Sequence, residues 1–292
     1  MYQAISSPYL VPCDGSFSYK NALSSIDSKM LDDKKYKKKL NKLTSQIYDL
    51  QRMMYAHNRY SLLLIFQAID AAGKDSTIRH VLTGVNPAGC QVHSFKSPSS
   101  LEVNHDFLWR TSLRLPERGR IGVFSRSYYE EVLVARVHPK LLDRQQLPDE
   151  HQHDDIWQQR YQSINDHELH LARNGTVILK FWLNLSKEEQ RMRFLRRLDK
   201  PDKHWKFSIS DVEERKHWDD YMLAYEQALQ ATARPWAPWY AIPADNKPFM
   251  RYSVAKIIVK TMESMNLEYP RLDPEVEYKL ECIRDSLLNE NE

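Results

Sequence analysis

The segment from Ser61 to Arg79, SLLLIFQAIDAAGKDSTIR, constrains the fold more than any other part of the chain. Its apolar run, Leu62 to Phe66, is typical of a strand buried on both faces, and a turn of small residues separates it from a segment that can begin a helix. A strand, a glycine turn, a lysine and hydroxyl residues at a helix start are the components of a phosphate-binding loop. Backbone N–H groups and the helix dipole would meet the anion there, and the lysine would neutralise it.

The loop departs from the pattern G-x-x-x-x-G-K-[ST] at two positions. Ala68 stands where the first glycine belongs, and Asp75 follows Lys74 where a hydroxyl residue is expected. An ordinary turn between a strand and a helix can also contain Gly-Lys, so the loop alone leaves both interpretations open. The candidate phosphate-binding residues are Ala72, Gly73, Lys74, Asp75, Ser76 and Thr77.

Composition narrows the class of protein. A chain of 292 residues suffices for one elaborated α/β domain or two small ones, and a net charge of +3 with no recognition module does not indicate nucleic-acid binding. Cys13, Cys90 and Cys282 are too far apart for a disulfide framework or a zinc site. The sequence has no signal-peptide pattern and no apolar run near the roughly 20 residues that span a bilayer. We therefore expect a soluble, cytoplasmic protein with no nucleic-acid or membrane partner.

Strand-like and helix-like segments alternate through the middle of the chain. The predicted strands are Leu62–Phe66, Gln91–Phe95, the apolar part of RIGVFSRSYY up to Phe124, TVILKFWLNL from Thr176, and a short strand within Ala237–Asp245. The predicted helices include Leu101–Leu113, Tyr129–Val137, Ile156–Arg173, Lys247–Met265, Asp273–Leu288 and one from Ser210 through Tyr225. This alternation predicts an α/β fold with a parallel sheet covered by helices on both faces.

Two further segments carry candidate functional residues. Ser125, Arg126 and Ser127 follow the third strand, at the edge where open α/β sheets bind ligands. A capping box at Ser186 begins a helix whose cations are expected opposite an apolar side of Phe194, Leu195 and Leu198. The cations are Arg193, Arg196, Arg197 and Lys200, with Arg191 at the border. Such a face can be merely solvated, but after a phosphate loop it is better explained as a helix that closes over phosphates.

The remaining segments leave alternatives open. Residues 1 to about 28 are expected to form an extended arm on the body or on a partner. The polar helix from Asp32 carries a lysine cluster that either meets a polyanion or forms a solvated face. His151 and His153 could bind a metal, although a solvated loop is the better explanation. The last helix is highly charged and could serve an oligomer contact.

The ordered set of motifs resembles the polyphosphate kinase 2 family, specifically its third class, over about residues 30 to 270. The segments that carry the resemblance are FQAIDAAGKDSTIRHVLTGVNP, HSFKSPS, HDFLWR, IGVFSRSYYEEVLVARVHP, GTVILKFWLNLSKEEQRMRFLRRL, KHWKFSISDVEER and APWYAIPADNK. The resemblance implies a three-layer P-loop kinase fold with a helical lid. The implied divisions are an arm and helical extension at 1–58, a core at 59–270 with the lid at about 186–215, and a C-terminal helix at 271–292.

The resemblance also implies reversible transfer of the terminal phosphoryl group of inorganic polyphosphate to AMP and ADP. Mg²⁺, with Mn²⁺ as an alternative, would assist, and a homo-oligomer, dimer or tetramer, is expected. Gly73 and Lys74 should cradle phosphates, Asp70 should hold the metal, and Arg126 should contact the transferring phosphates. Ser125 and Glu130 should lie near the nucleotide, and Arg191, Arg193 and Arg197 should close on polyphosphate.

Ser125 is a departure, because the family often has Asp there and its third class usually Asn. A nucleotide phosphate, with a second pKa of about 6, is already ionised at neutral pH and needs no general base. Two alternatives remain from the sequence: an ATP-dependent nucleoside monophosphate kinase, and a catalytically inactive polyphosphate-binding protein.

Overall fold

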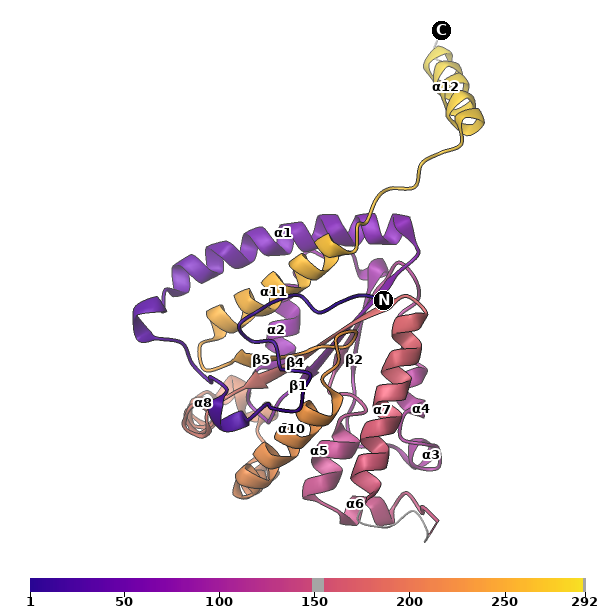
Figure 1. Cartoon of the computed structure of the whole chain (residues 1–292). Coiled ribbons are helices and arrows are strands. Elements are labelled where there is room, and N and C mark those ends of the chain that lie inside the picture. The colour runs from indigo at the N-terminus through magenta and orange to yellow at the C-terminus, as the bar shows by residue number, and fades with distance from the viewer. Residues whose placement is uncertain (149–154, 291–292) are drawn as a thin grey trace.

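The computed structural model describes residues 1–148 and 155–290. His151 and His153 lie outside the described residues, so their metal-binding interpretation has no structural test. Among the described residues the chain forms a sheet with helices on both faces (Figure 1).

The sheet contains five strands in the order β2-β3-β1-β4-β5, and every pairing is parallel. The strands are β1 (Ser61–Gln67), β2 (Cys90–Ser94), β3 (Ile121–Ser125), β4 (Thr176–Asn184) and β5 (Trp239–Pro243). Because parallel strands need a crossover between them, each connection passes over a face of the sheet. The predicted α/β, P-loop kinase-like fold is confirmed.

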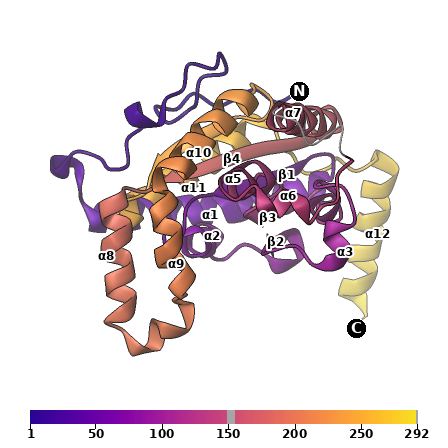
Figure 2. The same ribbon diagram turned by 90° about the horizontal axis from the view of Figure 1, so that it is seen from below.

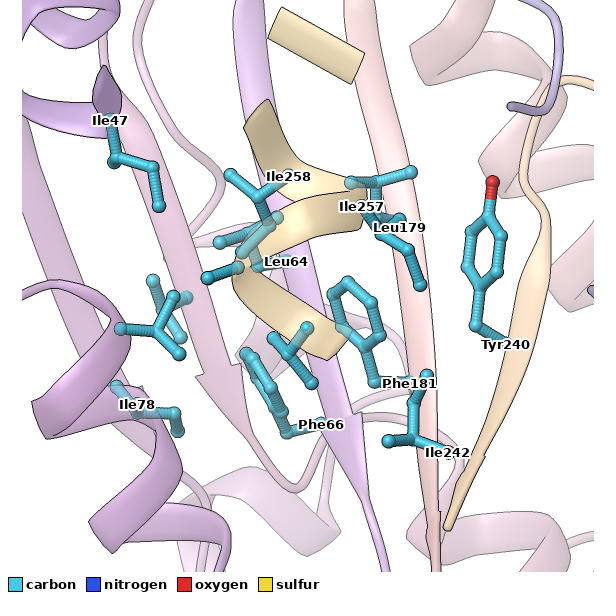
Figure 3. Close-up of a cluster of buried hydrophobic side chains, with 14 of the residues drawn as sticks. Ile47, Leu64, Phe66, Ile78, Leu179, Phe181, Tyr240, Ile242, Ile257 and Ile258 are labelled. Atoms are coloured by element: carbon cyan, nitrogen blue, oxygen red, sulfur yellow. The ribbon is translucent and has the colours of Figure 1, made fainter. Parts of the chain in front are cut away.

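Alternate residues of β1 enter two separate cores. Leu62, Leu64 and Phe66 belong to one apolar cluster, whereas Leu63 and Ile65 belong to the other. This is the consequence of the two-residue period of a strand when both faces are covered. Figure 3 shows the first cluster, in which side chains from the sheet meet those of the covering helices.

In the described part of the chain, three helices pack on each of the two apolar clusters. The first cluster lies under α1 (Asp33–His57), α2 (Lys74–Val81) and α11 (Lys247–Ser264), and the second lies under α5 (Glu130–Val137), α7 (Ile156–Arg173) and α10 (Trp218–Thr232). The other described helices are α3 (Ser100–Val103), α4 (Trp109–Ser112), α6 (Lys140–Asp143), α8 (Lys187–Leu198), α9 (Ile209–Glu214) and α12 (Pro274–Asn289). Short 3₁₀ turns occupy Tyr19–Asn21, Ser28–Met30, Pro87–Gly89, Pro201–Lys206 and Arg215–His217.

The N-terminal arm lies on the body of its own chain. The Val11 amide donates to the Trp239 carbonyl at 2.9 Å, and the Ala241 amide donates to the Tyr9 carbonyl at 2.8 Å. Val11 itself is buried. The arm therefore covers the edge of β5, an edge that would otherwise be a template for pairing with other chains.

Two predicted helices are wrong in their extent. The segment 101–113 contains α3 and α4 instead of one helix, because Asp106 accepts a hydrogen bond from the Leu108 amide at 2.9 Å and competes with the helical pattern. The helix expected from Ser210 bends between α9 and α10. At the bend Glu214 accepts from Tyr221 at 2.7 Å and contacts His138 at 3.0 Å, so tertiary contacts set its direction.

The helices α8 and α9 form a hairpin that extends from the sheet, in the place expected of a lid (Figure 2). We call residues 187–214 the α8–α9 hairpin. Arg197 and Asp211 connect its arms at 3.6 Å, and Phe194 meets Phe207 edge-on at a ring distance of 6.1 Å. None of the helices among the described residues combines the length and the apolar composition that a membrane span requires.

Candidate active site

The loop between β1 and α2 has the backbone conformation of an anion cradle. Ala71 and Gly73 both have positive φ, 64° and 101°. Space alone does not require glycine at position 73, since a Cβ there would come no closer than 3.6 Å to any neighbour. The conformation does require it, because left-handed backbone with φ near 101° is strained for residues with a side chain. Gly73 precedes the first turn of α2, whose N–H groups face the loop.

Lys74 lies across this loop with its side chain buried. Its Nζ donates to the Ala68 carbonyl at 2.5 Å and approaches the Ile69 carbonyl at 3.4 Å. Burial, and after it the Arg126 guanidinium, lowers the pKa of Lys74, while nearby carboxylates led by Asp70 oppose the shift. The ammonium is thus a desolvated cation held where phosphate oxygens would arrive.

Asp75 and Ser125 form a hydrogen-bonded pair at the two departures from the expected pattern. The Ser125 hydroxyl donates to Asp75 Oδ1 at 2.8 Å. P-loop nucleotide hydrolases hold Mg²⁺ with a hydroxyl residue after the loop lysine and a carboxylate at a strand end. Here the carboxylate follows the lysine and the hydroxyl ends the strand. The chain therefore retains one carboxylate and one hydroxyl in contact, with their positions exchanged.

Arg126 and Asp70 meet beside the loop, as the sequence predicts for residues at one edge of the sheet. Arg126 Nη2 donates to Asp70 Oδ1 at 2.9 Å. The Arg126 backbone has φ of 65°, a strained conformation that is common at functional sites. Burial acts to lower the pKa of Arg126, but Glu130 and Asp70 outweigh it and raise the pKa. Burial raises the pKa of Glu130, against the pull of Arg126 and Lys74.

A buried polar network fixes the turn that carries Arg126. Lys180 Nζ donates to Glu168 at 2.5 Å and to the Tyr129 hydroxyl at 2.9 Å, and the hydroxyls of Tyr128 and Tyr129 each donate to Glu168 at 2.9 Å. Burial lowers the pKa of Lys180 to about 8 despite the opposing Glu168 carboxylate. These contacts hold the start of α5, and with it the position of Arg126.

Two hollows meet at Arg126 and Glu130. The first extends toward α3, α4 and α6 and is lined by Lys96, Ser97, Pro98, Val103, Arg110, Arg126, Glu130, Glu131, Val134, Ala135, Leu141, Arg144 and Gln145. The second runs from the loop under the α8–α9 hairpin, where Asp211, Glu214, Trp218 and Tyr221 line it with Asp70. Arg126 and Glu130 thus lie together, with concave surface on both sides of the arginine. Ser125 lines neither hollow and directly precedes Arg126 at the end of β3.

A cationic cluster lies on the other side of the loop. It consists of Arg79, Arg196, Lys247 and Arg251. Arg251 Nη2 donates to the Ser76 hydroxyl at 3.1 Å, and its buried Nε makes no hydrogen bond within the described residues. Partial burial, with repulsion from Arg193, Arg196 and Arg251, lowers the pKa of Lys247 to about 8. Sequence reasoning missed this cluster, whose signal was the pair Lys247 and Arg251, four residues apart at the start of α11.

Thr77 and Ala72 make contacts that support the loop instead of facing a ligand. The Thr77 hydroxyl lies 3.8 Å from the sulfur of Met250, and its amide donates to the Gly73 carbonyl at 2.9 Å. Ala72 is buried, and its carbonyl accepts from Arg193 at 2.7 Å. Of the predicted loop residues, Lys74, Asp75 and Ser76 direct functional groups to neighbouring polar side chains or carbonyls.

Arg193 is held by protein groups instead of facing solvent. Its Nε donates to Glu189 at 2.8 Å, Nη1 to the carbonyls of Ala71 (3.1 Å) and Ala72 (2.7 Å), and Nη2 to those of Ala244 (2.6 Å) and Asp245 (3.0 Å). A guanidinium has five N–H donors, and each has an acceptor here. In this conformation Arg193 joins α8 to the phosphate loop and to the turn before α11.

The other predicted arginines of α8 lie elsewhere. Arg191 is exposed and pairs with Glu188 at 2.6 Å, and Arg197 contacts Asp211 at 3.6 Å. The predicted division of α8 into a cationic and an apolar face is therefore wrong. Arg193 is buried, whereas Leu195 and Leu198 on the expected apolar side are 41% and 47% exposed. Phe194, the third residue of that side, is buried as expected. The inward side of the helix is therefore set by the burial of Phe194 together with the acceptors that Arg193 reaches.

The carboxylate ligands that the site offers suit Mg²⁺. This ion binds in phosphoryl-transfer sites through one or two carboxylates together with water and substrate phosphates. Asp70 and Asp75 flank Lys74 in sequence, and each contacts a polar partner at the loop, so both are positioned to contribute. Among the described residues no group of three or more His, Cys, Asp or Glu side chains could hold a metal without such help.

The family model and the individual relatives that match this chain all describe the same kind of protein. A model of the family described as Polyphosphate kinase 2 matches residues 30–270. The chain is 55% identical over 254 residues to the ADP-polyphosphate phosphotransferase of Rhodopseudomonas palustris, covering 87% of this chain and 88% of that one. It is 44% identical over 229 residues to the AMP/ADP-polyphosphate phosphotransferase of Meiothermus ruber, covering 78% and 82%.

A solved structure agrees with the sequence relatives. The crystal structure of polyphosphate kinase 2 from Arthrobacter aurescens superimposes with a TM-score of 0.78 at 34% identity, covering 95% of this chain and 98% of that one. The family model spans most of the chain, and its match includes the loop, Arg126 and the α8–α9 hairpin. The chain therefore belongs to the polyphosphate kinase 2 family.

Proposed function

We propose that this protein transfers the terminal phosphoryl group of inorganic polyphosphate to AMP and ADP, reversibly, giving ADP and ATP. Family membership supports the reaction class, and the names of the Rhodopseudomonas and Meiothermus relatives support the two acceptors. The observation that carries the choice of donor is the cationic cluster. It prolongs the phosphate loop with positive charge beyond Ser76, which suits a chain of phosphates better than ATP.

The chemistry requires positioning and charge neutralisation. An oxygen of the acceptor's terminal phosphate attacks the last phosphorus of the chain, and the bond to the bridging oxygen breaks, so that the shortened chain leaves with that oxygen. The acceptor is already ionised, so Ser125 in place of a carboxylate does not remove a needed base. Lys74 and Arg126 neutralise the charge that spreads over the transferring group. When bound by Asp70 and Asp75, Mg²⁺, or Mn²⁺ in its place, would supply further neutralisation.

The two substrates approach Lys74 from opposite sides in this proposal. The donor chain lies over Ser76 and the cationic cluster, with Arg191 and Arg197 of the hairpin as further contacts. The nucleotide lies at Arg126, next to Ser125 and Glu130, where the two hollows provide apolar walls and aromatic rings for a base. The acidic residues of the second hollow, Asp211 and Glu214, argue against a polyanion there.

The test is a product assay with AMP, Mg²⁺ and long-chain polyphosphate without ATP, run beside Lys74→Ala. Formation of ADP and then ATP, with loss of both in Lys74→Ala, is the expected result. Product only after ATP is supplied would instead identify an ATP-dependent nucleoside monophosphate kinase. Tight polyphosphate binding without product from either donor would identify an inactive binding protein.

We also propose that the protein is cytoplasmic and that it forms a homo-oligomer. The three cysteines, Cys13, Cys90 and Cys282, are free thiols, which agrees with a reducing cytoplasm. A homo-oligomer, dimer or tetramer, is proposed from the family resemblance.

A further inference from the structure

The C-terminal helix α12 is held away from the rest of the molecule (Figure 1). It follows α11 after a linker without helix or strand, residues 265–273, and every residue from 268 to 290 is exposed. It also lies beyond residue 270, where the match to the family model ends. The function proposed above makes no use of this helix, so the inference drawn from it is independent of that function.

One side of α12 carries an apolar seam. Val276, Leu280, Ile283 and Leu287 follow one another at intervals of four, three and four residues, the spacing of the core positions of a coiled coil. Their exposed fractions are 41%, 48%, 54% and 57%. Side chains at this spacing project from one face of a helix, and half-exposed aliphatic groups in a row lower their free energy when a second helix covers them.

The charges beside the seam select the partner and its direction. Glu277 and Arg284 lie on one flank, and Lys279 and Ser286 lie on the other. In an antiparallel pair of identical helices like flanks meet, so Glu277 of each copy faces Arg284 of the other. In a parallel pair opposite flanks meet, and Lys279 would face Arg284. Neither Glu277 nor Arg284 takes part in an ion pair within the described residues, whereas Lys279 is bound to Glu275 of its own helix at 2.7 Å.

We propose that α12 pairs antiparallel with α12 of a second copy of this chain. The contact is isologous, so each pair contains two equivalent Glu277–Arg284 interactions and closes on itself. Leu280 of one copy packs on Ile283 of the other at the centre, and Val276 packs on Leu287 at each end. The linker, residues 265–273, allows the α/β parts of the two copies to stay apart while their α12 helices pack together. Four apolar residues per helix give a pairing that depends on protein concentration and, through the charges, on salt.

The test measures the mass of the full-length protein by sedimentation at low salt over a wide range of concentration. If the α/β parts are monomeric without α12, the wild type should reach twice the mass of Leu280→Asp. If the α/β parts associate by themselves, pairing of α12 within that assembly should make the wild-type assembly dissociate at a lower protein concentration than that of Leu280→Asp. Glu277→Arg or Arg284→Glu alone should raise the dissociation constant about tenfold, because each turns two symmetric attractions into repulsions. The double exchange Glu277→Arg with Arg284→Glu should restore it. Asp285→Arg, on the side opposite the seam, is the control and should change little.

Three results would overturn the proposal. Equal masses of wild type and Leu280→Asp at every concentration would exclude pairing through α12. Stronger association of Arg284→Glu would indicate a parallel pair, in which the new carboxylate meets Lys279. A lower melting temperature of Leu280→Asp without any change in mass would show that the seam docks on the body of its own chain.

Discussion

Lys247 is the residue whose charge is most sensitive to its surroundings in the proposed donor path. Its pKa is lowered to about 8 by partial burial and by the neighbouring Arg193, Arg196 and Arg251, while Glu189 is the carboxylate that opposes them. A lysine with a lowered pKa is charged below that value and loses its charge as pH rises through it. Attraction for a polyanion should be lost in the same range.

We therefore expect kcat/KM for polyphosphate to fall as pH rises through about 8, since this ratio reports groups of the free enzyme. Lys247→Arg should move the fall to higher pH, and Lys247→Met should raise KM for polyphosphate about tenfold, the loss of one charge-assisted contact. KM for AMP should stay the same. A fall that persists unchanged in Lys247→Arg would assign it to another group, such as Lys74, and remove Lys247 from the donor path.

At the residue scale, sequence reasoning found the groups that follow strands. Asp70, Lys74 and Arg126 converge because the carboxyl ends of parallel β1 and β3 share one edge of the sheet. Lys247 and Arg251 were not foreseen. Arg251 reaches Ser76, with Lys247 near it on α11, only through the packing of α11 against α2, and no local pattern encodes that proximity.

Among the elements, α8 shows why a helical wheel can misplace a residue. The wheel groups Arg193 with exposed arginines. Its acceptors, however, include carbonyls from two segments distant in sequence, the loop at Ala71 and Ala72 and the turn at Ala244 and Asp245, besides Glu189 of α8 itself. Only the folded chain assembles these carbonyls around one guanidinium. The position of the hairpin thereby becomes coupled to the conformation of the phosphate loop.

This coupling predicts that Arg193 acts by positioning. Arg193→Met should lower the free energy of unfolding by about 3–5 kcal/mol, since it leaves buried carbonyls and Glu189 without their donor. In the folded fraction kcat should fall by about tenfold or more while KM for polyphosphate changes little, because the loop loses its support. Thermal unfolding and steady-state kinetics measure the two effects.

The matched control is Arg191→Met, on the same helix but exposed and paired only with Glu188 within α8. It should leave stability nearly unchanged. If Arg193→Met instead raises KM for polyphosphate strongly at unchanged kcat, Arg193 releases the loop and contacts the donor during turnover, as the family resemblance implied.

On the scale of the whole molecule, the sheet separates the two sides from which, in the proposed function, polyphosphate and the nucleotide reach Lys74. The cationic cluster lies on the α2 and α11 side of the loop, and the two hollows lie on the side of Arg126 and α5. The parallel sheet with helices on both faces was predictable from the alternation of segments, whereas the order of its strands was not predicted. Nor was the assignment of each side to one substrate predictable, because it depends on which loops bring charge together after folding.

Because the two substrates reach Lys74 from opposite sides, both can be bound at the same time. We therefore expect the phosphoryl group to pass directly from one to the other. The two aspartates of the phosphate loop are engaged, Asp70 with Arg126 and Asp75 with Ser125, so neither is a free nucleophile. Initial rates measured while both AMP and polyphosphate are varied should give intersecting reciprocal lines. Protein incubated with labelled polyphosphate alone should acquire no acid-stable or acid-labile phosphate. Parallel lines with a labelled protein would contradict direct transfer, and comparison of Asp70→Asn with Asp75→Asn would then identify the carboxylate that carries the phosphoryl group.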